Sequence, residues 1–129
     1  MSWTNLIAVA SGGALGASTR YGINQGCVRQ GWYGLPAATF AVNVIGCFLA
    51  GVLLVWLDTR LQGALWWRNL LMVGFLGGLT TFSALGVEGF QLLRANRIDL
   101  FALTVLAHVA VGVLAVAAGW KLGQVAFPH

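Results

Sequence analysis

Charged side chains are scarce in this chain. Of its 129 residues only 8% are charged, seven of them basic and three acidic, whereas 59% are hydrophobic. Because ordinary soluble domains carry about a quarter charged residues, this composition excludes a soluble globular protein. The mean hydropathy of +0.84 is that of a chain that lies largely in lipid.

Cysteine is scarce as well, and the basic residues form no cluster. Cys27 lies near an expected loop and Cys47 lies deep in a hydrophobic run, so the two are not expected to pair within one subunit. Their spacing fits no metal site. The seven basic residues are dispersed along the chain, which argues against nucleic acid as a partner.

Long hydrophobic runs, by contrast, fill the chain. Each of four runs without Lys, Arg, Asp or Glu supplies the roughly 20 apolar residues that a membrane-spanning helix needs. These runs are Met1–Thr19, Gln30–Leu57, Asn69–Val87 and Leu100–Trp120. The first run lacks the basic start of a signal peptide and is interpreted as a retained helix. We therefore predict an all-α, multi-pass protein of the cell membrane, one domain over residues 1–129, with helices at approximately 4–24, 33–57, 69–94 and 100–122.

The basic residues give such a chain almost no preferred orientation. Three of them (Arg60, Arg68 and Lys121) fall on the side of the termini, and four (Arg20, Arg29, Arg94 and Arg97) fall on the other side. Basic residues in short loops set orientation, so the chain is expected to insert both ways up and to pair as an antiparallel homodimer. A single orientation with weak signals is the alternative. Four helices rarely enclose a pore, so transport would also favour an oligomer.

The third run contains a sequence that weakens helices. Residues 74–86, GFLGGLTTFSALG, hold four glycines and three hydroxyl residues, which are poor helix formers. At membrane depth, irregular backbone is tolerated only where it is buried in protein or lines a polar cavity. Broken helices of this kind turn carbonyls toward cations and N–H groups toward anions. We therefore predict a broken third helix, with an intact helix kinked at glycines as the alternative.

The first span carries glycines and an arginine on one face. Gly12, Gly16 and Arg20 recur at intervals of four, a spacing that lets helix backbones approach closely in lipid. Arg20 falls at the end of the expected span. There it either snorkels to the interface or provides a positive vestibule for an anion.

Other polar side chains at membrane depth are candidates for function. Thr39 and Asn43 share a face of the second span, and Asn43 must find a partner there, either a neighbouring helix or a permeating anion. Glu88 and His108 are functional candidates because ionisable groups are expensive in a membrane. The alternatives are a glutamate near the interface and a hydrogen-bonded packing histidine.

Three segments resemble the small fluoride channels of the Fluc (CrcB) family. They are GGALGASTRYG at 12–22, TFAVNVIGCFLAG at 39–51 and GFLGGLTTFSALG at 74–86, in the family's order and spacing. The likeness covers nearly the whole chain. It implies an antiparallel homodimer with two pores that pass fluoride, exclude chloride and let the cytoplasm shed toxic fluoride passively.

The resemblance also implies roles for individual residues. A structural sodium ion at the dimer centre would be held by the carbonyls of Gly77 and Thr80. The fluoride pore would be lined by Asn43, by Phe82 as the first phenylalanine of the family's pair, and by Thr39, Thr81 and Ser83. Arg20 would be the vestibule arginine and Glu88 the glutamate of the third helix.

The sequence departs from the family at several positions along the implied pore. The family's TTFSTF reads TTFSAL here, so Leu85 stands where the second phenylalanine is expected and Ala84 replaces a hydroxyl residue. Thr104, His108 and Gly112 stand where the family commonly has tyrosine and serines. Leu85 and His108 are therefore also assigned to the expected pore wall.

Two other functions compete with the channel, which is not an enzyme. A proton-coupled small multidrug exporter can also be a dual-topology four-helix dimer. It needs a carboxylate in the first helix, which this sequence lacks, so Glu88 would have to carry the proton. A non-transporting membrane assembly subunit would leave the polar sequence of the third run without a purpose.

Overall fold

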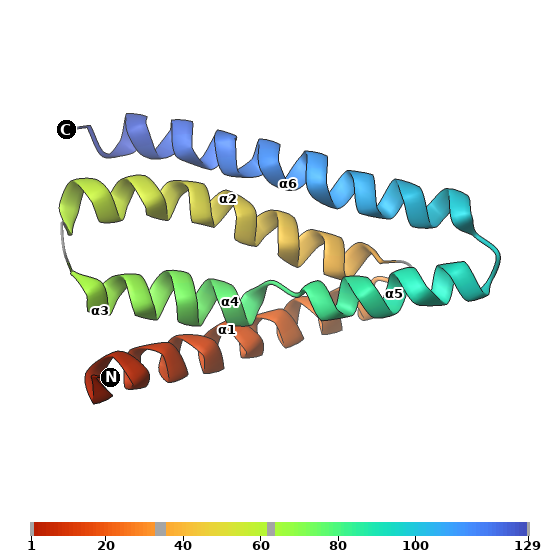
Figure 1. Ribbon diagram of the computed structural model, residues 1–129, viewed down its shortest axis with the longest axis horizontal. Helices are drawn as coiled ribbons and strands as arrows, with labels where there is room; N and C mark the ends of the chain where they lie inside the picture. Colours follow the sequence, from red (N-terminus) through yellow and green to blue (C-terminus); the bar gives the residue numbers. More distant parts are fainter. Residues whose placement is uncertain (1, 33–35, 62–63, 129) are drawn as a thin grey trace.

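The computed structural model describes residues 2–32, 36–61 and 64–128, and all regular structure within these ranges is helical. The start of the expected second span, residues 33–35, lies outside the described residues. The long elements lie lengthwise beside one another, and both termini are at the same end (Figure 1). In chain order the elements are α1 (Trp3–Arg29), α2 (Ala37–Arg60), α3 (Leu65–Arg68), the π-helix η1 (Asn69–Leu76), α4 (Gly77–Leu79), α5 (Phe82–Arg94) and α6 (Ile98–Ala126).

Several of these elements have the length and hydropathy of membrane spans. Three stretches qualify among the described residues: Ala37–Arg60, Leu65–Arg94 (α3 through α5) and Ile98–Ala126. The α1 helix has 27 residues but is not apolar enough to be counted with them. The predicted all-α membrane class is therefore confirmed.

Glycines allow two pairs of elements to pack at close range. On α1, Gly12 and Gly16 are buried, and a Cβ added at Gly16 would lie only 2.0 Å from the carbonyl oxygen of Phe75 in η1. Between α2 and α6, a Cβ at Gly119 would lie 2.0 Å from the carbonyl oxygen of Phe48. The close-packing face predicted for the first span is thus present, and its partner is η1.

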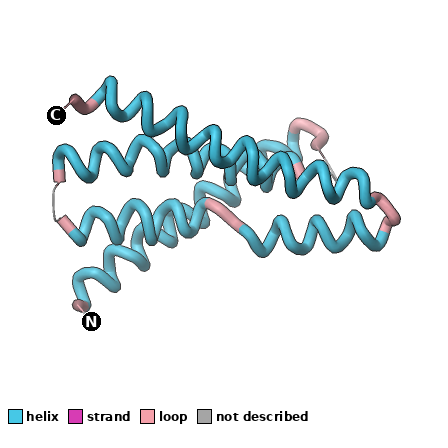
Figure 2. The backbone as a smooth tube through the Cα atoms, turned by 45° about the horizontal axis from the view of Figure 1, so that its top comes forward, coloured by secondary structure: helices cyan, strands magenta, loops and turns pink. Residues whose placement is uncertain are grey.

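Between α4 and α5 the backbone is not helical. Thr80 (φ −81°, ψ 156°) and Thr81 (φ −150°, ψ 116°) are both extended, and a loop separates the two helices (Figure 2). Gly77 and Gly78 lie three and two residues before Thr80, and glycine weakens a helix. The chain therefore has two non-helical residues in the middle of a membrane-length stretch, where their backbone groups need other partners.

The seam between α1 and η1 predicts a position-dependent effect of alanine. Gly16→Ala should lower the unfolding temperature in detergent, because the added methyl group meets backbone and overpacking costs about 1–3 kcal/mol. Gly22→Ala is the matched control, since no heavy atom lies within 4 Å of a Cβ there and alanine favours helix. Equal unfolding temperatures for the two variants would contradict the seam.

Candidate functional site

The side chain of Asn43 holds the extended segment in place. Its Nδ2 donates to the carbonyl oxygen of Thr81 at 3.2 Å, and the N–H of Thr81 donates to Asn43 Oδ1 at 2.8 Å. One carboxamide thus satisfies both backbone polar groups of a residue that has left the helix. Asn43 therefore bonds to a neighbouring element, and its second N–H is the one donor that it has left for another partner.

The hydroxyl of Thr81 starts the next helix. Thr81 Oγ1 accepts the N–H of Ala84 at 3.1 Å, as an N-cap side chain does. It also lies 3.2 Å from the hydroxyl of Ser83. Thr81 is 9% exposed, so its backbone and hydroxyl are satisfied inside the protein rather than by solvent.

These bonds deprive two carbonyl oxygens of their usual donors. In an unbroken helix the N–H of Thr81 would bond to the carbonyl of Gly77. The N–H of Ala84 would likewise bond to the carbonyl of Thr80. Both N–H groups bond to side-chain oxygens instead. Among the described residues, the carbonyl of Thr80 has one side-chain donor, Arg20, whose Nη1 lies 3.5 Å from Thr80 O. The carbonyls of Gly77 and Thr80 therefore lack the backbone donors that an unbroken helix would give them.

A polar groove of about 430 Å³ opens beside this segment. Its lining residues are Arg20, Asn24, Thr81, Ser83, Ala84, Val87 and Glu88. Because α1 continues to Arg29, Arg20 does not lie at a helix end, and its guanidinium turns toward Thr80 instead of snorkelling along the helix. The groove thus combines a fixed positive group with hydroxyl and carboxyl groups.

Glu88 is held by α2 at one oxygen and left unpaired at the other. The hydroxyl of Thr39, which is 5% exposed, donates to Glu88 Oε1. Glu88 Oε2 and Asn24 Oδ1 are buried and have no hydrogen-bond partner among the described residues. Buried polar groups are almost always paired, so these two oxygens are unsatisfied acceptors beside the groove.

Asn24 is the one polar residue of the groove that the sequence did not suggest as a candidate. It follows Arg20 by four residues, so the two share a face of α1. That spacing is the signal that would have identified it, because a carboxamide beside an arginine at membrane depth needs a polar environment.

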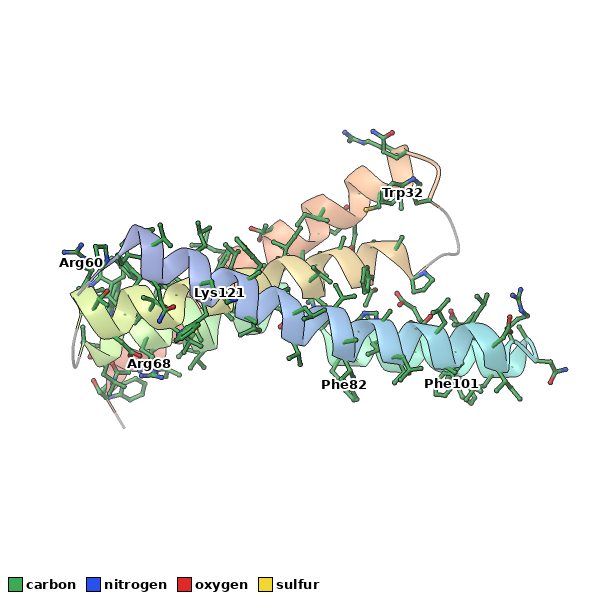
Figure 3. All side chains as sticks on the ribbon, turned by 90° about the horizontal axis from the view of Figure 1, so that it is seen from above. Trp32, Arg60, Arg68, Phe82, Phe101 and Lys121 are labelled. Carbon is green, nitrogen blue, oxygen red and sulfur yellow. The ribbon has the colours of Figure 1, made fainter. Side chains whose placement is uncertain are left out.

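Three of the predicted pore residues lie apart from the groove. Phe82 is 85% exposed and projects from the outer edge of the bundle (Figure 3). Leu85 is half-buried on α5 and does not line the groove. His108 lines a separate, mostly apolar pocket between α2 and α6. Within a single chain, the structure brings together the arginine, hydroxyl and carboxyl candidates but not these three.

The chain is similar to known proteins over nearly its whole length. Residues 7–120 match the family described as CrcB-like protein, Camphor Resistance (CrcB). A protein of Xanthomonas euvesicatoria pv. vesicatoria (strain 85-10) named "Fluoride-specific ion channel FluC" is 39% identical over 122 residues, 95% of this chain and 92% of the relative. The protein of that name from Xylella fastidiosa (strain 9a5c) is 41% identical over 121 residues, 94% of this chain and 85% of the relative. The one from Hahella chejuensis (strain KCTC 2396) is 40% identical over 122 residues, 95% of this chain and 96% of the relative.

Proposed function

This chain belongs to the CrcB family, whose members are ion channels and not enzymes, and from that membership we propose that it is a fluoride channel. The observation that carries the proposal is the similarity to fluoride-specific channels, which extends over 94–95% of the chain. The channel lets fluoride leave the cytoplasm passively. The exporter and the assembly subunit receive no support from this similarity.

The polar groups of the site suit an anion that must lose its water. Fluoride is small and strongly hydrated, so its passage needs close, directed donors. Arg20 and Ser83 in the groove and the second N–H of Asn43 are such donors. Phe82 lies outside the groove of its own chain and would add the positive edge of its ring in the dimer proposed below. We assign Thr39, Thr81 and Glu88 to the same polar path, in which they position these donors.

We further propose that the chain crosses the membrane four times and forms an antiparallel homodimer. The third crossing, residues 65–94, is broken at Thr80 and Thr81. A second copy would cover the large apolar side chains that α5 exposes, Phe82, Val87, Phe90 and Leu93. Basic residues at both ends of the bundle support dual insertion. Arg60, Arg68 and Lys121 lie at the end with the termini (Figure 3), and Arg94 and Arg97 flank the opposite turn.

A structural sodium ion fits the carbonyls at the broken crossing. Sodium is a hard cation that takes oxygen ligands, and unwound backbone carbonyls of broken membrane helices coordinate it in other proteins. Gly77 and Thr80 would each supply a carbonyl without its helical donor, and two copies would supply four. No heavy atom lies within 4 Å of a Cβ built at Gly77, so the chain itself leaves room there for a second copy. Arg20 Nη1 is 3.5 Å from the carbonyl oxygen of Thr80, a long hydrogen bond. Because a carbonyl oxygen has two lone pairs, one would remain for the ion.

Fluoride release from vesicles tests the proposed channel. Vesicles that contain the protein should release fluoride, recorded with a fluoride electrode, and retain chloride. Asn43→Asp should slow release because it sets a carboxylate oxygen against the Thr81 carbonyl. Phe82→Ile should slow it because the ring edge is lost. The loss of one polar contact at the top of the barrier costs about 1–3 kcal/mol, which slows fluoride release by roughly one to two decades.

A phenylalanine on the same helix provides the control for this measurement. Phe90 is also exposed on α5, at 61%, and belongs to the same proposed dimer contact as Phe82, but it does not line the groove. Phe90→Ile keeps an apolar side chain in that contact, so it controls for the change in dimer packing and should leave fluoride release unchanged. If vesicles with correctly assembled protein release no fluoride, the channel assignment is wrong. If fluoride release is unaffected in both Asn43→Asp and Phe82→Ile, these two residues do not line the pore.

Cysteine labelling tests the antiparallel assembly. Ala95→Cys, in a Cys27→Ser background, places a thiol in the exposed turn between α5 and α6. A membrane-impermeant maleimide should reach about half of the molecules from each side of the membrane, because the basic residues set no orientation. Labelling of all molecules from one side would contradict the dual insertion.

A further inference from the structure

A second pocket follows the groove along α5. It has a volume of about 280 Å³ and is lined by Gln91, Arg94 and Ala95, and we call it the outer pocket. Gln91 follows Val87, which lines the groove, by four residues, and Arg94 follows Gln91 by three. Residues at these intervals are neighbours on one face of a helix. The groove and the outer pocket therefore lie along the same face of α5.

The outer pocket lies closer to water than the groove does. From the break at Thr80 and Thr81, α5 runs to the end of the bundle away from both termini (Figure 1), and Gln91 and Arg94 are exposed there. Because a helix rises about 1.5 Å per residue, Arg94 is about 9 Å farther along α5 than Glu88, the last groove residue on this helix. An anion that approaches the groove along this face meets the outer pocket first.

Arg94 carries a charge that no neighbouring carboxylate balances. Among the described residues there is one salt bridge, and it belongs to the next arginine, because Nε and Nη2 of Arg97 each donate to an oxygen of Asp99 at 3.1 Å. Glu88, the acidic residue on the same face of α5, is bonded to the hydroxyl of Thr39. The guanidinium of Arg94, with its five N–H donors, is thus left without a carboxylate partner in the described chain.

We propose that the outer pocket collects anions at the mouth of the fluoride pathway. Arg94 supplies the positive charge, and the carboxamide of Gln91 supplies an N–H donor beside it. The site rests on the proposed function, because the anion that it passes to the groove is fluoride. Exposed side chains leave most of the water of an anion in place, so the pocket raises the local concentration of any small anion. The selection of fluoride falls to the donors of the groove.

A role in the stability of α5 alone makes a different prediction. Arg94 is in the last turn of α5, where a basic side chain stabilises the end of a helix. Loss of that contact lowers the unfolding temperature but does not change how fast a folded channel collects fluoride. Gln91→Glu separates the two roles, because a glutamate three residues before Arg94 pairs with it on the helix surface. This variant keeps Arg94 in place and cancels its charge in the pocket.

Fluoride release from vesicles, measured at a low fluoride concentration, tests the site. The ionic strength is set with the sodium salt of a large organic anion and is equal inside and outside. At about 0.01 M, where the screening length is about 30 Å, Arg94→Gln and Gln91→Glu should each slow release roughly threefold. At about 1 M, where that length is about 3 Å, both should release fluoride as fast as the unmodified protein. Arg94→Lys keeps the charge and should release fluoride at the unmodified rate in both salts.

Arg97→Gln is the matched control for these variants. It removes the same charge three residues farther along the chain, from a side chain that does not line the outer pocket. At low ionic strength it should slow fluoride release less than Arg94→Gln does. Equal slowing by the two variants would overturn the pocket as a site, because general surface charge would then explain the effect.

Two further results would overturn the outer pocket. One is a slowing by Arg94→Gln that persists at high ionic strength, and the other is an unchanged rate of release in Gln91→Glu at low ionic strength. If Arg94→Gln fails to assemble, Gln91→Glu decides the question by itself. A lack of protein-dependent fluoride release in every salt would instead overturn the channel, and the mouth of its pathway with it.

Discussion

The pairing of one carboxamide with one backbone residue organises the polar centre of this chain. Without Asn43, the N–H and carbonyl of Thr81 would be buried without partners, at about 1–3 kcal/mol each. With Asn43 in place, Thr81 remains extended and its hydroxyl caps α5. The carbonyls of Gly77 and Thr80 then lack their helical donors. A side chain on α2 thereby determines which backbone atoms of another element are available to an ion.

Close backbone packing brings the positive charge to the same place. A Cβ at Gly16 would lie 2.8 Å from the backbone nitrogen of Leu79, so α1 touches the end of α4 directly. Arg20 follows Gly16 by one turn on the same face, which sets its guanidinium level with Thr80. A larger residue at position 16 would separate the two backbones. The glycine is thus a requirement of the site as well as of the packing.

The sequence predicted the class of the protein and the position of its polar centre, because both depend on local composition. Charge scarcity and long apolar runs indicated a membrane protein, and the glycines and hydroxyls of 74–86 marked the segment in which Thr80 and Thr81 are extended. Local composition could not predict the partner of Asn43. It is 38 residues away, and the contact depends on how far α2 is shifted along the third stretch. The separation of Phe82 and His108 from the groove has the same cause, since tertiary packing decides which faces meet.

The pairing of Asn43 with Thr81 is tested most directly through the proposed sodium ion. The unfolding temperature of the unmodified protein should be higher in sodium than in potassium, because an ion that binds only the folded state stabilises it. Asn43→Leu keeps a similar volume but cannot bond to Thr81, so its unfolding temperature should be the same in both salts. Ser83→Ala, which leaves the pairing intact, should retain the difference. If the unfolding temperature depends on sodium equally in Asn43→Leu and in the unmodified protein, the role of Asn43 is contradicted. If the unmodified protein unfolds at the same temperature in both salts, the sodium site is contradicted.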